Sequence, residues 1–556
     1  MTPETASKTL TSRFSPYIVI TMLYLLFTLF LWPVGNYPLN DDWVYAKGVL
    51  LTLEQGRYTI TGYEQAWGVP QVLLGVLLCK LFGFSHSLLR WVGILSALVS
   101  ASGLLYLLLR NKLDKNIATM TALTFLFFPP VVGTSFSFMT DMMFAAFWIW
   151  ALIFTYESHE EKSYIKLFLA CLLIVLSILQ RQFGILIPVA ASGIAGIIVL
   201  QKVVQRTKPS CFDIVFGVTQ LLLSSMYFII DKFWWQTLQG NWSPPIEISI
   251  HLLSFSHNWT ISVIYAGILS APLLLVSRFK KNDFSLFSVA LLLFFIVLSL
   301  LIMFVKNEFF PFFGNLISDF GFFKPGEVLM GVRPVILTPF FKLVFSLIGT
   351  AGGFLLIYAF AQTITGLCSG LRNGFNNIFA IGLGSSALFY LAVLVQFRET
   401  LFDRYLIPVF ILASPLSFIY LNIKKQSRIQ TFKRLLFVTC ILFVCFSYTF
   451  EYEFLDLNKA RWDACQYAVS KGIPPQNIEG GYEWNGSYRK RRLAEDPAQS
   501  VQFGWWNMGT YEEPTHAIVS YSDVDIQGLP TQTISFPYKS FYSKNTKIYL
   551  KLIQGL

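Results

Sequence analysis

Residues 167–200 have the sequence LFLACLLIVLSILQRQFGILIPVAASGIAGIIVL, which is almost wholly apolar apart from Arg181-Gln182. Lys166 precedes this stretch and Lys202 follows it. An excess of Lys and Arg marks the cytoplasmic loops of membrane proteins, so both ends are predicted to lie inside the cell. The stretch therefore predicts a hairpin of two membrane helices, with Arg181 at its outer tip.

The composition of the whole chain agrees with this interpretation. Of the 556 residues, 54% are hydrophobic and only 13% are charged, whereas a soluble protein carries about 25% charged residues. The net charge of +11 could suggest nucleic acid, but the positive residues lie in short loops between apolar runs, which is the pattern of cytoplasmic loops. Nucleic acid is therefore excluded as a partner.

Similar runs recur along the chain and predict an all-α polytopic bundle of about 13 membrane-spanning helices. The first is an uncleaved helix over Tyr17–Val34, which leaves the N-terminus in the cytoplasm. The stretch Val69–Phe84 is expected to lie on or dip into the outer leaflet, because a full span there would place the next basic loop outside. Besides the hairpin, the remaining helices are predicted over residues 88–109, 117–132, 142–156, 212–231, 259–277, 284–305, 341–361, 377–396, 405–422 and 435–450.

These spans divide the chain into two predicted domains. Residues 1–450 form the transmembrane domain, whose first outer loop covers residues 35–87, and residues 451–556 form a small soluble α/β domain. An amphipathic helix is predicted over Leu457–Lys471, with strands over Ala517–Ser520 and Lys547–Leu552. An odd number of spans places this domain outside the cytoplasm. We expect the whole chain to be a multi-pass protein of the plasma (inner) membrane.

A pair of carboxylates, Asp41-Asp42, follows the first helix in the sequence NDDWVY. Adjacent carboxylates near a membrane surface can supply a general base, because partial burial and a neighbouring negative charge raise a pKa. The alternative is that Asn40 or an Asp caps a surface helix beginning near Trp43. A third carboxylate, Asp141, is expected to open a helix at the outer face; it too could be a cap, and it is also a functional candidate.

Candidate phosphate-binding residues also fall on the predicted outer side. Arg181 suits a phosphate because its planar fork donates hydrogen bonds in pairs; the alternative is an anchor that snorkels to the interface. In the segment QFRETLFDRY, residues 396–405, Arg398 and Arg404 could grip a lipid phosphate and Tyr405 could donate a hydrogen bond to it. The alternative there is an internal ion pair between Asp403 and either arginine.

Other catalytic signatures are absent from the sequence. It contains no P-loop, no GxSxG and no HExxH motif. The seven cysteines form no CxxC pair and no cluster with zinc spacing.

The arrangement resembles the GT-C class of membrane glycosyltransferases, in the branch of the protein O-mannosyltransferases and the lipid A aminoarabinose transferase (glycosyltransferase family 39). Four features carry the resemblance: the acidic pair in the first outer loop, an acidic residue in the second, the segment KLFGFS with a following Leu-Arg, and the motif RYLIP. They are Asp41-Asp42, Asp141, Lys80–Ser85 with Leu89-Arg90, and Arg404–Pro408. The Lys-Pro-Pro motif of many members is absent, and the second acidic residue of the pair is Asp rather than Glu.

The resemblance implies roles for these residues. Asp41 would be the general base that takes a proton from an acceptor hydroxyl, with Asp42 beside it, and the configuration at the anomeric carbon would invert. Arg181 and Arg404 would stabilise the departing lipid phosphate. Asp141 would orient the acceptor or hold a divalent metal ion. In the first outer loop, Tyr45 and Glu64 are candidates for contact with the acceptor or the sugar.

Three functions remain open at this point. The first is a transferase that takes its sugar from a polyprenyl-phosphate donor outside the cytoplasm and passes it to a lipid, glycan or protein acceptor. The second is a polysaccharide polymerase or ligase that uses a diphosphate-linked donor. The third is a lipid or sugar transporter, which the lack of internal repeats disfavours.

Overall fold

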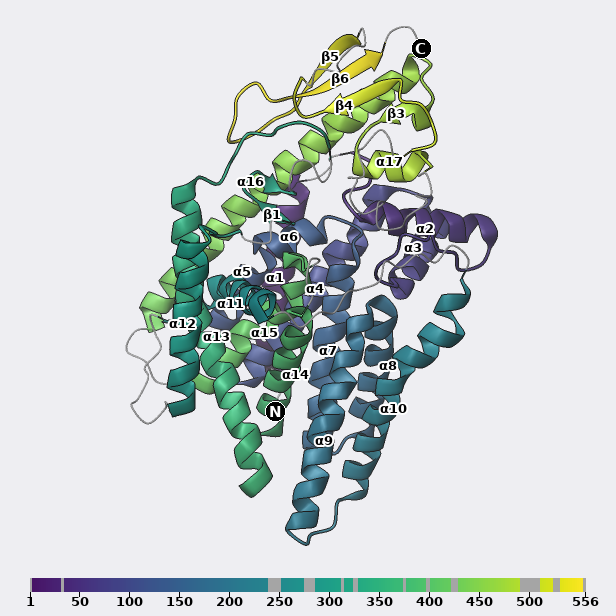
Figure 1. The fold of residues 1–556 in the computed structure, drawn as a ribbon. Helices are drawn as coiled ribbons and strands as arrows, with labels where there is room; N and C mark the ends of the chain where they lie inside the picture. Colours follow the sequence, from purple (N-terminus) through teal and green to yellow (C-terminus); the bar gives the residue numbers. More distant parts are fainter. Residues whose placement is uncertain are drawn as a thin grey trace.

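The computed structural model describes residues 3–31, 35–238, 252–274, 286–311, 315–323, 329–373, 377–396, 401–421, 429–490, 511–523 and 531–553. A helical bundle makes up most of the molecule, and a small β-sheet lies at one end of it (Figure 1). The sheet, the helices α2 and α3, and the short helix α17 all lie toward the same end of the bundle (Figure 1).

The helices show a multi-pass membrane protein. Within the described ranges, six helices are long and apolar enough to cross a membrane, or seven if one bent pair counts as a span. The predicted number of about 13 stays a prediction. The six are α4 (His86–Arg110), η1 with α9 (Gln182–Ile185 and Leu186–Val204), α10 with η2 (Cys211–Phe233 and Trp235–Thr237), α12 (Leu286–Val305), α13 (Pro339–Asn373) and α16 (Ile429–Ser470). The other bundle helices are α1 (Pro3–Leu31), α5 (Lys115–Leu126), α6 (Pro129–Ser135), α7 (Thr140–Glu161), α8 (Tyr164–Gln180), α11 (Leu252–Leu274), α14 (Ile378–Leu394) and α15 (Ile407–Leu421).

Two predicted helices differ from the observed elements. The helix expected over residues 117–132 is broken into α5 and α6, which meet at an angle of 61°. Pro129 and Pro130 begin α6; proline has no N–H to donate and clashes with the preceding turn, so the chain bends there. The helices expected over 435–450 and 457–471 are one continuous helix, α16, which crosses the predicted domain boundary.

The predicted hairpin is confirmed. Helices α8 and α9 are the two arms, and they are joined by Arg181 and the 3-10 turn η1. Arg181 has extended backbone angles (φ −146°, ψ 136°) at the end of α8, so its side chain leaves the helix at the hairpin tip.

The first outer loop contains two helices that cover one end of the bundle. Helix α2 (Asp42–Gln55) has most of its residues buried, and α3 (Val69–Phe82) has 14 residues. At about 1.5 Å per residue, α3 is shorter than the ~30 Å hydrocarbon core. This length agrees with the prediction that the stretch does not span the membrane.

The segment predicted as a C-terminal domain, residues 451–556, keeps the name C-terminal domain below; its described part begins with the end of α16. Its sheet has the order β3-β4-β6-β5, with β3 parallel to β4 and the other pairs antiparallel. Strands β4 (Ala517–Ser520) and β6 (Lys547–Ile553) match the predicted strands, whereas β5 (Thr531–Pro537) and the short β3 (Ile478–Glu479) were not predicted. A second hydrophobic core, which includes Ala464, Cys465, Trp484, Val519 and Ile548, joins α16 to the sheet.

Five short elements complete the part of the fold that surrounds the site. The hairpin β1–β2 (Ile317–Ser318 and Gly321–Phe322) precedes α13, and the 3-10 turn η4 (Asp403–Leu406) precedes α15. The 3-10 turn η5 (Pro475–Asn477) precedes β3, and helix α17 (Tyr482–Tyr488) follows β3. Helix α17 contacts α2.

Candidate active site

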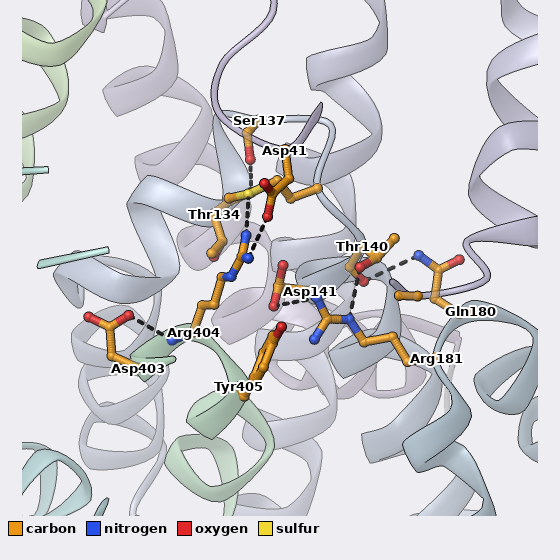
Figure 2. A network of polar contacts seen from close by, with 12 residues as sticks. Asp41, Thr134, Ser137, Thr140, Asp141, Gln180, Arg181, Asp403, Arg404 and Tyr405 are labelled. Carbon is orange, nitrogen blue, oxygen red and sulfur yellow. Dashed lines mark hydrogen bonds and ion pairs between the residues drawn. The ribbon is translucent and has the colours of Figure 1, made fainter. Parts of the chain in front are cut away.

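Asp41 lies at the junction between the membrane bundle and the C-terminal domain. It occupies the N-cap position of α2, but its side chain makes no capping hydrogen bond. Instead its Oδ2 lies 2.5 Å from Nη2 of Arg404, and its Oδ1 accepts a 2.7 Å hydrogen bond from the hydroxyl of Tyr482 (Figure 2 shows the arginine). The capping alternative therefore does not hold for Asp41.

The surroundings of Asp41 favour its ionised form. Burial raises the pKa of this carboxyl, but the charge of Arg404 and the hydrogen bonds from Tyr482 and Arg404 outweigh burial, so the pKa lies below its usual value of 3.8. The side chain is still 29% exposed, whereas that of Arg404 is 4% exposed. Asp41 is thus a carboxylate at neutral pH that a ligand can reach.

Asp42 has different partners from Asp41. It is buried, and its two oxygens accept hydrogen bonds from the backbone N–H groups of Leu39 (2.5 Å) and Phe138 (3.2 Å). Burial raises the pKa of Asp42 to about 8, against the opposing charge of Arg90. Asp42 therefore ties the first outer loop to the loop before α7, and it shares none of the partners described for Asp41.

Asp141 and Arg181 form a second buried acid–arginine pair. Nη2 of Arg181 lies 3.0 Å from Oδ1 of Asp141, and Nε of Arg181 donates a 2.8 Å hydrogen bond to the hydroxyl oxygen of Thr140 (Figure 2). Thr140 and Asp141 begin α7, yet α7 has no side-chain cap. Because Arg181 is buried and paired, it is not a snorkelling anchor.

Tyr405 lies between the two acid–arginine pairs (Figure 2). Its ring is 4.8 Å from the guanidinium carbon of Arg181 and 5.5 Å from that of Arg404. The 3-10 turn η4 supplies both Arg404 and Tyr405, so the hairpin tip and η4 present two cations to one space.

Asp403 has a structural role in this turn. It is fully buried and accepts backbone hydrogen bonds from Leu316, Ile317 and Arg404, at 3.0, 2.9 and 2.9 Å. Burial raises its pKa to about 6. Asp403 fixes η4 against β1 through backbone groups, so the predicted alternative of an ion pair with the Arg404 side chain is wrong.

Tyr45 and Glu64 lie in the same outer loop as Asp41, but their polar atoms make hydrogen bonds to backbone groups of that loop. The Tyr45 hydroxyl donates a 3.1 Å hydrogen bond to the carbonyl of Ala66. Glu64 accepts hydrogen bonds from the backbone N–H groups of Thr61 and Gly62, at 2.7 and 2.9 Å, and burial raises its pKa. Both residues shape the loop, and their contact with a sugar stays a prediction. Arg398 lies outside the described residues.

Two site residues from the C-terminal domain were missed by the sequence reasoning. Tyr482 donates to Asp41, and Oε1 of Glu483 accepts a 2.7 Å hydrogen bond from the N–H of Asn40. They lie 441 and 443 positions from their partners, and no local motif marks them. The neighbouring Asn485 begins the sequence Asn-Gly-Ser, which matches the N-glycosylation motif. Its side chain is buried and bonded to Glu479, so it is not accessible in this fold.

The arrangement of carboxylates does not form a metal site in the described part of the chain. There, no group of three or more His, Cys, Asp or Glu side chains is placed to hold a metal ion. Asp41 and Asp141 are each paired with an arginine instead. We therefore derive no step through a metal ion.

A wholly apolar pocket lies close to this site. Its walls come from α11, α13, α16, the α5–α6 bend and β1, and every lining side chain is apolar. Ile317 connects the two regions, because it lines the pocket and its backbone N–H is held by Asp403. The lining residues are Phe128, Pro129, Ile268, Phe310, Ile317, Leu337, Phe345, Phe443, Phe446 and Phe450.

Comparison with known families confirms the predicted resemblance. Residues 73–242 match the family model described as dolichyl-phosphate-mannose-protein mannosyltransferase. The matched segment, less than half of the chain, carries Asp141 and Arg181, whereas Asp41 and Arg404 lie outside it. At the level of class, the chain is similar to the GT-C membrane glycosyltransferases.

Two solved structures are similar to the chain over nearly its full length. The crystal structure of ArnT from Cupriavidus metallidurans bound to undecaprenyl phosphate covers 97% of this chain and 98% of that chain, with 11% identity and a TM-score of 0.48. The structure of the same protein in the apo state covers 96% and 97%, with 13% identity and a TM-score of 0.38. No curated protein sequence matches the chain.

Proposed function

We propose that the protein is an inverting glycosyltransferase that moves a sugar from a polyprenyl-phosphate donor to an acceptor hydroxyl at the extracytoplasmic face of the membrane. One observation carries this proposal: two acid–arginine pairs, Asp41–Arg404 and Asp141–Arg181, flank Tyr405. The family match over residues 73–242 supports the class of the donor, because that family is described by a polyprenyl-phosphate sugar.

Asp41 is the general base in this proposal. Its carboxylate takes the proton of the acceptor hydroxyl as that oxygen forms a bond to the anomeric carbon. The bond between that carbon and the phosphate oxygen breaks, and its electron pair leaves with the lipid phosphate. Among the site carboxylates, Asp41 has the right properties because it is ionised and partly exposed, whereas Asp42, Asp141 and Asp403 are buried.

Arg404 and Arg181 bind the departing phosphate. Among the described residues, Nη1 of Arg404 donates only to the thioether sulfur of Met139, at 2.9 Å, and a thioether is a weak acceptor that a phosphate oxygen can replace. A fixed guanidinium lowers the barrier most when it faces charge that develops in the transition state. The preference of arginine for phosphate also comes from its planar fork of donors.

The contact between Asp41 and Arg404 has a consequence for the order of events. Inversion places the acceptor oxygen and the leaving phosphate on opposite sides of the anomeric carbon. We therefore place the phosphate on Nη1 of Arg404 and expect the guanidinium, whose Nη2 contacts Asp41, to turn away from Asp41 as the donor binds. When Arg404 turns to the phosphate, Asp41 loses its strongest partner, and its pKa rises toward the ordinary value. The donor would thereby make Asp41 a better base as it binds.

The apolar pocket beside η4 is suited to part of the donor lipid. Aromatic and aliphatic walls bind an isoprenoid chain through burial of apolar surface, which is worth roughly 25 cal/mol per Å². Asp403 and Ile317 connect this pocket to the arginine that would hold the phosphate. A chain bound there would be held within reach of the polar site.

Donor turnover tests the proposal. The purified protein in lipid is given labelled polyprenyl-phosphate sugars and, in parallel, diphosphate-linked sugars, and release of sugar to water or to an acceptor is measured. We expect turnover with a monophosphate donor, lost in Asp41→Asn and kept in Glu54→Gln, an exposed acid on α2. Turnover with diphosphate donors alone would support the polymerase or ligase alternative. No turnover with any donor, together with movement of lipid-linked sugar across vesicles, would support a transporter.

A further inference from the structure

We propose that Tyr482 and Glu483, at the start of α17, are positioning residues for Asp41, so that the C-terminal domain is a working part of the site. This inference rests on the proposed function, because it assigns Asp41 as the base. The described contacts at Asp41 come from both domains: Arg404 of the bundle binds Oδ2, and Tyr482 of the C-terminal domain binds Oδ1. When Arg404 binds the phosphate instead of Asp41, the hydrogen bond from the Tyr482 hydroxyl still holds the Asp41 carboxylate.

Glu483 fixes the backbone from which Asp41 projects. The preceding residue, Asn40, has φ of +53°, a left-handed conformation that costs an L-residue energy and is tolerated best by Gly, Asn and Asp. Oε1 of Glu483 accepts the N–H of this residue at 2.7 Å. The hydrogen bond stabilises the turn and so determines the direction of the Asp41 side chain.

Arg461 holds Glu483 in turn. Its Nη2 lies 2.7 Å from Oε2 of Glu483, and both side chains are fully buried. Arg461 belongs to α16, the helix that also runs through the bundle. A buried ion pair is sensitive to the loss of either partner, so α16 transmits its position to Asn40 through two buried side chains.

The contact between α17 and α2 is close and directional. Nζ of Lys47 on α2 donates to the carbonyls of Gly486 and Ser487 on α17, at 3.2 and 3.4 Å. The rings of Trp43 and Tyr482 meet edge to face, with centroids 6.0 Å apart. These contacts hold the Tyr482 hydroxyl at the carboxylate, so the domain does more than cover the site.

The first test removes the Tyr482 hydroxyl alone. Tyr482→Phe in the full-length protein in lipid is compared with Tyr488→Phe, the same change on the same helix at a half-exposed tyrosine. A hydrogen bond to a charged group is worth about 1.5–3 kcal/mol, so we expect kcat to fall about 10- to 100-fold in Tyr482→Phe and to stay unchanged in Tyr488→Phe. The acid limb of the rate profile should move to higher pH, because this hydrogen bond lowers the pKa of Asp41. Unchanged kcat and an unchanged profile in Tyr482→Phe would overturn the inference.

A second test does not need activity. Asp41→Cys is made in a protein whose exposed cysteines are replaced by serine, and the rate of its alkylation is followed against pH. If Tyr482 donates to position 41, Tyr482→Phe should raise the apparent pKa of the new thiol and Tyr488→Phe should not. Equal alkylation curves with and without Tyr482→Phe would overturn the inference, even if the wild-type protein turns over donor. A shifted curve, together with a wild-type protein that turns over no donor, would reject the proposed function while the contact of Tyr482 with position 41 stands. The replaced cysteines are Cys211, Cys368 and Cys445.

Discussion

Asp41 and Arg404 are 363 positions apart in the chain, yet Oδ2 of Asp41 lies 2.5 Å from Nη2 of Arg404. The pair joins the first outer loop to the turn before α15. It also keeps a carboxylate ionised beside a cation that can bind an anion, which are the two charges that a phosphate-releasing transfer needs.

Asp41→Asn should remove catalysis and leave the fold intact. The amide can still accept a hydrogen bond from Tyr482, but it cannot take a proton, and a positioned general base contributes about 10²- to 10⁴-fold. We expect kcat to fall by that factor. The melting temperature should also fall, because the buried guanidinium of Arg404 loses its charged partner. Full activity in Asp41→Asn would show that another group is the base.

Asp42→Asn should instead affect stability. Asn can accept from one of the two backbone N–H groups, but its NH2 would face the other, and one unsatisfied buried group costs about 1–3 kcal/mol. Asp463→Asn, at a half-exposed side chain, is the control. A loss of activity in Asp42→Asn at unchanged melting temperature would contradict this assignment.

The effect of Asp42→Asn should depend on pH. Burial raises the folded-state pKa of Asp42 to about 8, above its ordinary value of 3.8. Between these two pH values the folded state holds a proton that the unfolded state has lost. The wild type should therefore lose stability as pH rises from about 4 to 8. Asparagine does not titrate, so the difference in melting temperature between the two proteins should narrow over this range.

Arg404→Gln and Arg181→Gln should differ in their pH profiles. The charge of Arg404 is the main factor that lowers the pKa of Asp41, whereas Arg181 makes a smaller contribution. Without Arg404 the pKa of Asp41 rises, so this base becomes protonated at a higher pH. The acid limb of the kcat/KM profile therefore moves to higher pH. Both variants should also lose rate, about 10²- to 10³-fold for each lost donor to the developing charge. Equal acid limbs in the two variants would contradict the pairing.

The sequence predicted the positions of several site residues because their local patterns are strong. Arg181 was predicted at a hairpin tip from two apolar arms with basic ends, and the structure places it between α8 and α9. Asp41 and Asp141 were candidates because Asp41 follows the first membrane helix in the predicted outer loop and Asp141 opens a helix at the predicted outer face. What these patterns do not contain is the pairing: Asp41 with Arg404 and Tyr482, and Asp141 with Arg181, depend on tertiary packing.

The differences between the predicted and observed elements also have physical reasons. Glu451, Glu453 and Asp456 end the apolar run near residue 450, but acidic residues are compatible with a helix, so α16 continues after hydropathy stops. Strand β5 was not predicted because Ile534 and Phe536, which pack against the second core, are its only large apolar residues and make too short an alternation to mark a strand. Hydropathy shows where a chain meets lipid, and it is a weaker guide where a helix or strand leaves the membrane.

Gly486→Ala tests the fit between the two domains. A Cβ at this position would lie 2.4 Å from the ring of Trp43, which is buried and cannot move away freely. Overpacking of this kind costs about 1–3 kcal/mol, and it would push α17, with Tyr482, away from α2. We expect a lower melting temperature and a lower kcat. In the control Gly193→Ala, the new Cβ meets nothing within 4 Å, so neither the melting temperature nor kcat should fall.

A second change separates this steric effect from a general loss of stability. Trp43→Phe makes room for the Cβ, so the double variant Trp43→Phe/Gly486→Ala should regain kcat relative to Gly486→Ala alone. Because the two residues touch, their effects should be strongly non-additive in a double-mutant cycle. Additive losses would mean that the close approach of α17 to α2 does not control the position of Tyr482, and the C-terminal domain would then act on Asp41 by some other route.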